Sequence, residues 1–258
     1  MISLVIPTLN EADNIEPLID RLLRSEPPLD EIIFVDDGST DGTQDRILSL
    51  DASPVPIQLL ERRAPAFGLS GAVIAGARVA VGDWLVVMDA DLSHPPEKIG
   101  ELLRPLLAGE ADMVIGSRYI DGGSTPGWPL WRKSLSRLAA GLAYPLTGVQ
   151  DSMCGFFAVP RDLLLELSPA ATGFKIAFEA LVQGGRNVRV MEIPIVFRDR
   201  ARGVSKMSFG VALVFALRWI AAMATTLWRA QEAGARCDRR SSIASAAKRN
   251  KVANIALP

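Results

Sequence analysis

The chain has 258 residues, of which 49% are apolar and 22% charged, and its formal net charge is −1. This is ordinary globular usage, and the length allows a single α/β domain with a large core. The near-neutral charge excludes a general attraction to nucleic acid, so any anion must be bound by a local cluster. The two cysteines, Cys154 and Cys237, provide no disulfide framework and suit a reducing compartment.

Apolar runs alternate with helical patterns, which predicts an α/β fold with a mostly parallel sheet flanked by helices. The N-terminus has no basic leader, and it is expected to start with a strand rather than a signal peptide. We expect strands at 2–6, 31–36, 56–61, 84–89 and 112–116, and helices at 13–24, 41–50, 68–81 and 96–107.

The second predicted strand ends in the acidic cluster from Asp36 to Thr43. Ligands of an open parallel sheet bind beyond the carboxyl ends of its strands, so this cluster is a candidate ligand loop. A capped turn into a helix from Asp41 explains the same residues. A calcium loop is excluded because its twelfth position would be Leu48. A dehydrogenase-type dinucleotide fold is also excluded, since no Gly-x-Gly-x-x-Gly follows the first strand.

A second acidic motif, Met88 to Glu97, follows the apolar run Trp84 to Val87. Asp89 and Asp91 should project together if the backbone stays extended, and paired carboxylates suit a divalent ion that keeps open positions for phosphate oxygens. The competing interpretation is an acidic turn in which Asp91 caps a short helix. For His94, the single histidine, we favour a structural place in this turn over metal ligation.

Further motifs follow in order: Gly116 to Tyr119, Asp151 to Phe157, Gly173 to Lys175, Glu192 to Ile195 and Arg202 to Lys206. Together with Val5 to Glu11 and the two acidic motifs, they resemble the family 2 glycosyltransferases of the GT-A fold. Within that family they are most similar to the polyprenol-phosphate (dolichol-phosphate) mannosyltransferases. The acidic motifs are common to the whole superfamily. The string from Asp89 to Glu97, combined with the later Gly-Phe-Lys and Gly-x-Ser-Lys segments, is specific to a much smaller group of enzymes.

The resemblance implies a GT-A catalytic domain over residues 1–207 and a divalent ion, Mg²⁺ or Mn²⁺, on Asp89 and Asp91. Better-known archaeal relatives carry an amide where this chain has Ser93, so a water is expected to complete the metal's ligands here. The implied contacts to the nucleotide-sugar donor are Pro7, Thr8, Asn10, Glu11, Asp36, Asp37, Ser39, Asp41 and Lys175.

Basic residues in the matching segments are the implied phosphate ligands, because the arginine fork suits phosphate oxygens. Each one alone is consistent with a solvated surface charge; as a set, phosphate binding is favoured. The resemblance places Arg118 and Arg132 at a lipid phosphate, and Arg202 and Lys206 near the donor diphosphate and a closing loop. Arg200 lies in the same region, and Glu179 could orient an arginine or a sugar hydroxyl. The catalytic set is therefore Asp89, Asp91, Arg118, Arg132, Arg202 and Lys206.

The expected reaction is inverting transfer of mannose from GDP-mannose to a polyprenyl phosphate, whose anionic oxygen needs no general base. One alternative is a UDP-glucose-dependent enzyme acting on the same lipid, or another family 2 transferase. A non-catalytic sugar-nucleotide-binding protein is disfavoured because the acidic and basic sets are both present.

The twenty residues from Phe209 to Trp228 are long enough to cross a bilayer, but Arg218 lies near their middle. The insertion cost of this arginine, about 2.5–3.5 kcal/mol, roughly cancels the gain from the apolar residues. A crossing helix, an interfacial helix and a buried helix therefore stay open for residues 208–229. We expect a flexible basic tail at 230–258, a membrane and a lipid phosphate as partners, and an active site on the cytoplasmic face. A membrane subunit is a further expected partner.

Two other segments carry expectations. Gly122 to Gly127 predicts a long loop, which is either a lid over the substrates or a plain surface connection. Pro129 to Leu135 mixes aromatic, basic and apolar residues in the way interfacial segments do.

Overall fold

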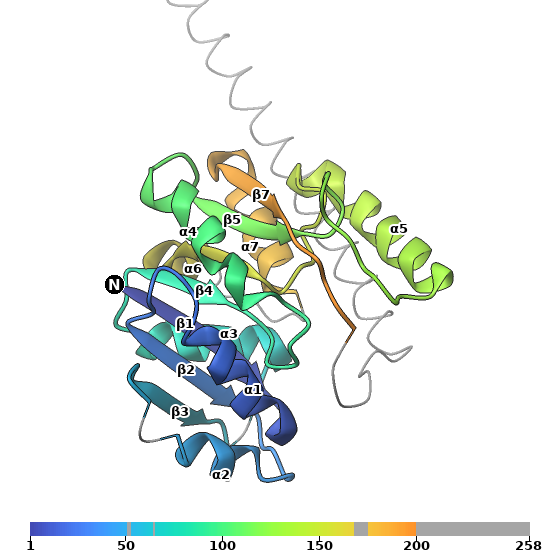
Figure 1. The fold of residues 1–258 in the computed structure, drawn as a ribbon. Coiled ribbons are helices and arrows are strands. Elements are labelled where there is room, and N and C mark those ends of the chain that lie inside the picture. Colours follow the sequence, from blue (N-terminus) through green and yellow to red (C-terminus); the bar gives the residue numbers. More distant parts are fainter. Residues whose placement is uncertain (51–52, 64, 168–174, 200–258) are drawn as a thin grey trace, which may run out of the picture. The chain divides into compact units, whose positions relative to one another are not determined.

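The computed structural model describes residues 1–50, 53–63, 65–167 and 175–199, which form a seven-stranded sheet covered by helices (Figure 1). The predictions for 200–258, which include the helix at 208–229, the tail, Arg200, Arg202 and Lys206, lie outside these residues. None of the helices in the described ranges combines the length and hydrophobicity that a bilayer crossing requires.

The sheet confirms the predicted α/β fold. Its spatial order is β3-β2-β1-β4-β6-β5-β7, and β6 alone among these strands runs antiparallel to its neighbours β4 and β5. Each of the five predicted strands matches an observed strand, with ends that differ by two residues at most. The strands are β1 (Ile2–Thr8), β2 (Glu31–Asp36), β3 (Ile57–Glu61), β4 (Trp84–Val87), β5 (Met113–Ser117), β6 (Phe157–Pro160) and β7 (Val190–Pro194).

Helices cover both faces of the sheet. Figure 1 shows α1 and α4 in front of the sheet and α3, α6 and α7 behind it, and the packing agrees, because α3 contacts β1, β2 and α6 while α4 contacts β5, β6 and β7. The predicted helix at 96–107 is a 3₁₀ turn followed by α4. The helical elements are α1 (Ala12–Leu22), α2 (Thr43–Leu48), α3 (Gly68–Val79), η1 (Pro96–Lys98), α4 (Ile99–Leu107), α5 (Leu130–Thr147), α6 (Arg161–Leu167), α7 (Ile176–Gly184) and η2 (Gly185–Asn187).

The strands in the middle of the sheet are buried on both faces, as expected for a parallel sheet with helices on either side. All residues of β1 and β2 are buried. Gly76 lets α3 approach the sheet closely, because a Cβ at this position would lie 2.5 Å from Cγ1 of Val5. A larger residue would therefore push α3 away from the strand that leads into the first ligand loop.

Register brings the candidate site residues to one edge of the sheet. Thr8 at the end of β1 pairs with Asp36 at the end of β2, and Val87 at the end of β4 pairs with Phe157 at the start of β6. The antiparallel β6 therefore starts where the parallel strands end. Residues before β6 and residues after β1, β2, β4 and β5 consequently meet at this carboxyl edge, where ligands of such sheets bind.

Candidate active site

The loops after β1 and β2 are joined by hydrogen bonds between side chains and backbone. Asn10 accepts the backbone N–H of Thr40 at 2.9 Å, and its own N–H donates to Oγ of Ser39 at 2.9 Å. At the next residue, the N–H of Glu11 donates to Oγ1 of Thr43 at 2.9 Å. These reciprocal bonds hold two loops from neighbouring strands as one unit, which supports the predicted ligand loop.

Several residues of the predicted donor set stabilise this unit themselves. Asp36 is fully buried, and its Oδ1 accepts the N–H groups of Gly38 and Ser39 at 3.0 and 2.9 Å. Thr8 is also buried. Asp41 accepts the N–H of Ala12 at the start of α1 at 3.1 Å and the N–H of Thr43 at 3.0 Å, so it forms a turn at the predicted place. The N-cap of α2 is Gly42, however, without a side-chain cap hydrogen bond. The contacts of these donor-set residues to a nucleotide, and that of the buried Pro7, stay predictions.

Asp37 is held by a residue that the sequence did not single out. Arg62, at the end of β3, donates to Oδ1 of Asp37 at 2.8 Å and also to the carbonyls of Ala66 and Gly68. Burial raises the pKa of Asp37, and the charge and hydrogen bond of Arg62 oppose that rise. Arg62 therefore fixes both the carboxylate and the loop before α3 beside the ligand unit.

The two aspartates after β4 lie on a tight turn. Leu92 between Asp91 and Ser93 has φ +62°, an uncommon conformation for a branched residue. This turn lets Oδ1 of Asp91 accept the N–H of Ser93 at 3.1 Å. Asp91 is buried, whereas Asp89 is partly exposed, and both carboxylates lie close enough to His94 to act on its charge.

The residues present fit a divalent ion. Among the residues that the structure describes, no three His, Cys, Asp or Glu side chains gather as a metal site, and the candidate protein ligands are the carboxylates of Asp89 and Asp91. The Oγ of Ser93 is buried without a hydrogen-bond partner, which is unusual for a hydroxyl beside two carboxylates. Gly155 leaves room there, since a Cβ would lie 3.3 Å from both carboxylate oxygens of Asp89. Such an open, oxygen-lined site suits Mg²⁺ or Mn²⁺ with phosphate oxygens as further ligands.

Arg118 lies buried beside this motif rather than at the surface. Its Nε and Nη2 donate to the two oxygens of the fully buried Asp151, each at 2.7 Å. Burial acts to lower the pKa of Arg118, but the hydrogen bonds and charge of Asp151 outweigh it and raise that pKa. Glu192 of β7 holds Asp151 in turn, because its carboxylate accepts the N–H groups of Gln150 and Asp151 at 2.9 Å.

Aromatic rings surround the Arg118 guanidinium. The rings of Tyr119, Trp128 and Phe197 lie 5.2–5.5 Å from its Cζ, within the range of cation–π attraction. Arg132 stacks over Trp128 at 4.0 Å and forms a 3.0 Å ion pair with Asp199. Arg118 and Arg132 therefore share one aromatic residue, which confirms that they belong to one cluster. The aromatic rings in this cluster were missed in the sequence, where no regular spacing connects them.

Lys175, directly before α7, joins the acidic and basic parts of the site. Burial and the neighbouring Arg118 lower the pKa of Lys175, while the carboxylates of Asp89 and Asp151 oppose that effect. The amine therefore lies within electrostatic reach of both the metal motif and the arginine cluster. Glu179 follows one turn later in α7, and its predicted role stays a prediction.

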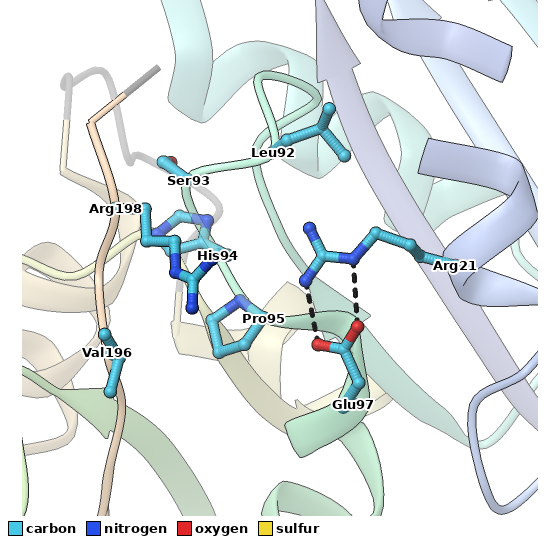
Figure 2. A pocket seen from close by; sticks show the side chains of 8 residues that line it. All are labelled: Arg21, Leu92, Ser93, His94, Pro95, Glu97, Val196 and Arg198. Carbon is cyan, nitrogen blue, oxygen red and sulfur yellow. Dashed lines mark hydrogen bonds and ion pairs between the residues drawn. The ribbon is translucent and has the colours of Figure 1, made fainter. Parts of the chain in front are cut away.

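A cavity of about 370 Å³ opens beside the acidic motif (Figure 2). Figure 2 shows Arg198 and Arg21 on opposite sides of it, with Ser93, His94 and Pro95 between them. Arg21 is engaged by Glu97 through two hydrogen bonds of 2.8 and 2.9 Å. The turn that carries the metal motif is thus accessible along one side.

Comparisons with known proteins agree with this geometry. The model of the family described as "Glycosyl transferase family 2" matches residues 3–167. The chain belongs to glycosyl transferase family 2. The chain is therefore a glycosyltransferase, and the two acidic motifs lie within the residues that the family model matches.

Two curated relatives are similar over most of the chain. The "Dolichol-phosphate mannosyltransferase" of Pyrococcus furiosus is 41% identical over 80% of this chain, which spans only 59% of that relative's length. The "Polyprenol monophosphomannose synthase" of Mycolicibacterium smegmatis is 37% identical over 79% of this chain and 80% of its own.

A solved structure shows the same fold. Glucosyl-3-phosphoglycerate synthase from Mycobacterium tuberculosis, crystallised with Mn²⁺, UDP-glucose and glycerol 3-phosphate, superposes with a TM-score of 0.65. The match has 23% identity and covers 87% of this chain and 79% of that one. At this identity the likeness establishes the GT-A architecture alone.

Proposed function

We propose that this family 2 glycosyltransferase transfers mannose from GDP-mannose to the phosphate of a polyprenyl or dolichyl phosphate. The observation that carries the proposal is the meeting of two unlike clusters at one sheet edge. Asp89 and Asp91 provide a site for a cation with phosphate oxygens, and Arg118, Arg132 and Lys175 provide positive charge for a second anion. The names of the two curated relatives support the same donor sugar and acceptor class.

The donor is assigned to the loops after β1, β2 and β4. The joined loops at Asn10 and Ser39 face the nucleoside, and Asp89, Asp91 and the Ser93 hydroxyl would hold Mg²⁺ or Mn²⁺. A bound divalent ion neutralises the charge that develops on the departing nucleoside diphosphate. Arg202 and Lys206 are proposed to bind the same diphosphate.

The acceptor is assigned to the arginine cluster. A phosphate monoester is already anionic at neutral pH, so its oxygen can attack without a general base. The bond from the anomeric carbon to the diphosphate breaks as the bond to the acceptor oxygen forms on the opposite face, which inverts the configuration. Asp151 occupies Nε and Nη2 of Arg118, and Asp199 occupies Nη1 of Arg132. We therefore assign the acceptor phosphate to the remaining N–H groups of these two guanidiniums, with Lys175 beside them.

A membrane surface is proposed to meet α5, at the segment where the sequence indicated interfacial character. In α5 the small residues Ala140 and Ala143 are buried, whereas Trp131, Leu135, Leu138 and Leu142 are exposed. At 100° per residue these four lie within one narrow stripe that points away from the buried face. An exposed apolar stripe of this kind is the feature that lets a helix lie in a membrane interface. We assign this surface to the cytoplasmic face; a membrane subunit stays a prediction.

The test is sugar transfer by the full chain in detergent with Mn²⁺ or Mg²⁺. Radiolabelled GDP-mannose and UDP-glucose are compared as donors, and polyprenyl phosphate is compared with polyprenol as acceptor. We expect labelled lipid with GDP-mannose and the phosphate acceptor alone. Equal labelling of polyprenol would contradict the assigned acceptor chemistry, because a hydroxyl needs a general base for its attack whereas a phosphate oxygen does not. Labelling from UDP-glucose instead would keep the reaction class and overturn the donor.

A further inference from the structure

His94 is fully enclosed in the turn that carries the metal motif. Its ring stacks on Phe156 with centroids 5.4 Å apart and an interplanar angle of 17°, and the edge of Phe197 contacts it at 5.2 Å. Its Nδ1 accepts the backbone N–H of Asp89 at 3.2 Å, and its Nε2 lies 3.8 Å from Sγ of Cys154. Two aromatic side chains thus fix the ring plane, and Nδ1 also lies 3.8 Å from Oδ2 of Asp89.

These contacts determine which nitrogen carries the proton. An acceptor must have a free lone pair, so the bond from Asp89 leaves Nδ1 unprotonated and places the imidazole proton on Nε2. Nε2–H then points at the sulfur of Cys154, a weak acceptor. With its proton turned away from the carboxylates, the ring presents only a lone pair to the backbone of Asp89.

The bond to His94 is made where the chain leaves the sheet. β4 ends at Val87, and the N–H of Met88 still donates to the carbonyl of Val5 at 3.3 Å, so the bond from Asp89 to His94 follows directly on this sheet contact. The side chain of Asp89 is partly exposed and has Gly155 on its inner side, where a Cβ would approach its oxygens to 3.3 Å. The N–H of Asp89 is therefore a point at which the chain is held as it passes from the strand into the turn.

We propose that His94 is a positioning residue: it fixes the backbone of Asp89 through Nδ1 and thereby sets the carboxylate geometry for the divalent ion. This inference rests on the metal role of Asp89 in the proposed function. Mutating a group that hydrogen-bonds to a metal ligand and orients it typically lowers metal affinity or activity by about 10- to 100-fold. His94 itself binds no metal in this arrangement, since Nδ1 is used by the backbone and Nε2 faces the thiol.

The experiment compares two amide side chains at this position. In His94→Asn the oxygen lies the same number of bonds from Cβ as Nδ1 and can accept the Asp89 N–H. In His94→Gln the amide reaches the place of Nε2 and leaves that N–H without its acceptor. Both variants lose the ring, so a difference between them reports the hydrogen bond and not the packing. Thermal unfolding checks that both are folded, and His94→Phe, which keeps the ring shape without an acceptor, is the third variant.

Mn²⁺ affinity is measured by electron paramagnetic resonance on the full chain without donor, and amide exchange is followed for a peptide that contains Asp89. We expect about tenfold weaker Mn²⁺ binding and faster exchange for His94→Gln and His94→Phe, with His94→Asn close to the wild type. Equal Mn²⁺ affinity and equal exchange in the Asn variant and the Gln and Phe variants would overturn the inference. Failure of the wild type to use GDP-mannose would contradict the proposed donor but not this inference, because neither readout involves a donor.

Discussion

The nucleotide side and the acceptor side of the site share one sheet edge but are stabilised by different forces. On the nucleotide side, partly exposed polar residues such as Asn10 and Ser39 exchange hydrogen bonds between neighbouring loops. On the acceptor side, a buried ion pair joins Arg118 to Asp151, 33 positions apart, and aromatic rings enclose it. The exposed bonds on the nucleotide side cost little desolvation, although the buried Asp36 and the ion pair of Arg62 and Asp37 on the same side do carry such a cost. The acceptor side depends on every partner, because a buried charge without its counter-charge is strongly unfavourable.

The metal motif lies between the two sides. Removing a negative charge from it should therefore reduce both metal binding and sugar transfer. In Asp91→Asn the amide oxygen can still accept the N–H of Ser93, so the turn is expected to keep its shape while metal affinity is lost. We expect kcat to fall by about a thousandfold or more, because stabilisation of the departing diphosphate is lost. Transfer assays and Mn²⁺ titration measure this. Asp83→Asn, at the exposed opposite end of β4, is the matched control and should behave as wild type.

The contrast between buried and exposed pairing can be tested on stability. In Asp151→Ala the buried Arg118 loses its partner, and we expect about 3–5 kcal/mol less unfolding free energy. Urea denaturation measures the loss. The structure provides a matched control, since Arg189 binds Asp112 in the same bidentate way at 3.0 and 2.7 Å, but at the surface. Asp112→Ala should cost clearly less. Equal losses would mean that burial of the Arg118 pair has no special energetic role.

The same contrast explains what the sequence could predict. Strands and acidic loops follow from local patterns: apolar runs, turn residues and two aspartates spaced two apart at a strand end. Those local rules place Asp36, Asp37, Asp89 and Asp91 at one edge, as observed. They also give the turn at Asp41, whose carboxylate accepts the N–H of Thr43 only two positions away.

The acceptor side depends on partners far apart in the chain. From the sequence alone, Arg118 is expected to be a solvated surface charge, because its counter-ion, Asp151, lies 33 positions away. The antiparallel β6 brings Asp151 to it, and no periodicity predicts that reversal. α5 was missed as a helix for another reason: its small residues face the domain and its large apolar residues face outward, against the usual pattern.

The outward stripe of α5 provides a test of acceptor-side surface chemistry. Leu135→Ser and Leu138→Ser together remove two exposed apolar side chains and leave the buried Ala140 and Ala143 untouched. If α5 rests on lipid, binding to vesicles with anionic phospholipid should weaken about tenfold or more, since each side chain contributes about 1.5–3 kcal/mol when buried. Vesicle co-sedimentation measures this. The matched control is Leu48→Ser in α2, also exposed but on the nucleotide side, which should leave vesicle binding unchanged. Unfolding free energy should change little in either variant, because none of these residues is part of the core.

The smallest expected effect concerns the buried thiol beneath His94. Burial raises the pKa of Cys154 to about 12, against an ordinary value of 9.0. Above pH 9 the unfolded chain loses this proton while the folded chain keeps it, so the unfolding free energy should fall with rising pH. One titrating group gives a slope of up to about 1.4 kcal/mol per pH unit. Urea denaturation at pH 8 and pH 10 should therefore show a smaller decline in Cys154→Ala than in the wild type. Cys237 is present in both proteins, so its titration cancels in the comparison, and parallel declines would contradict a neutral, enclosed thiol at position 154.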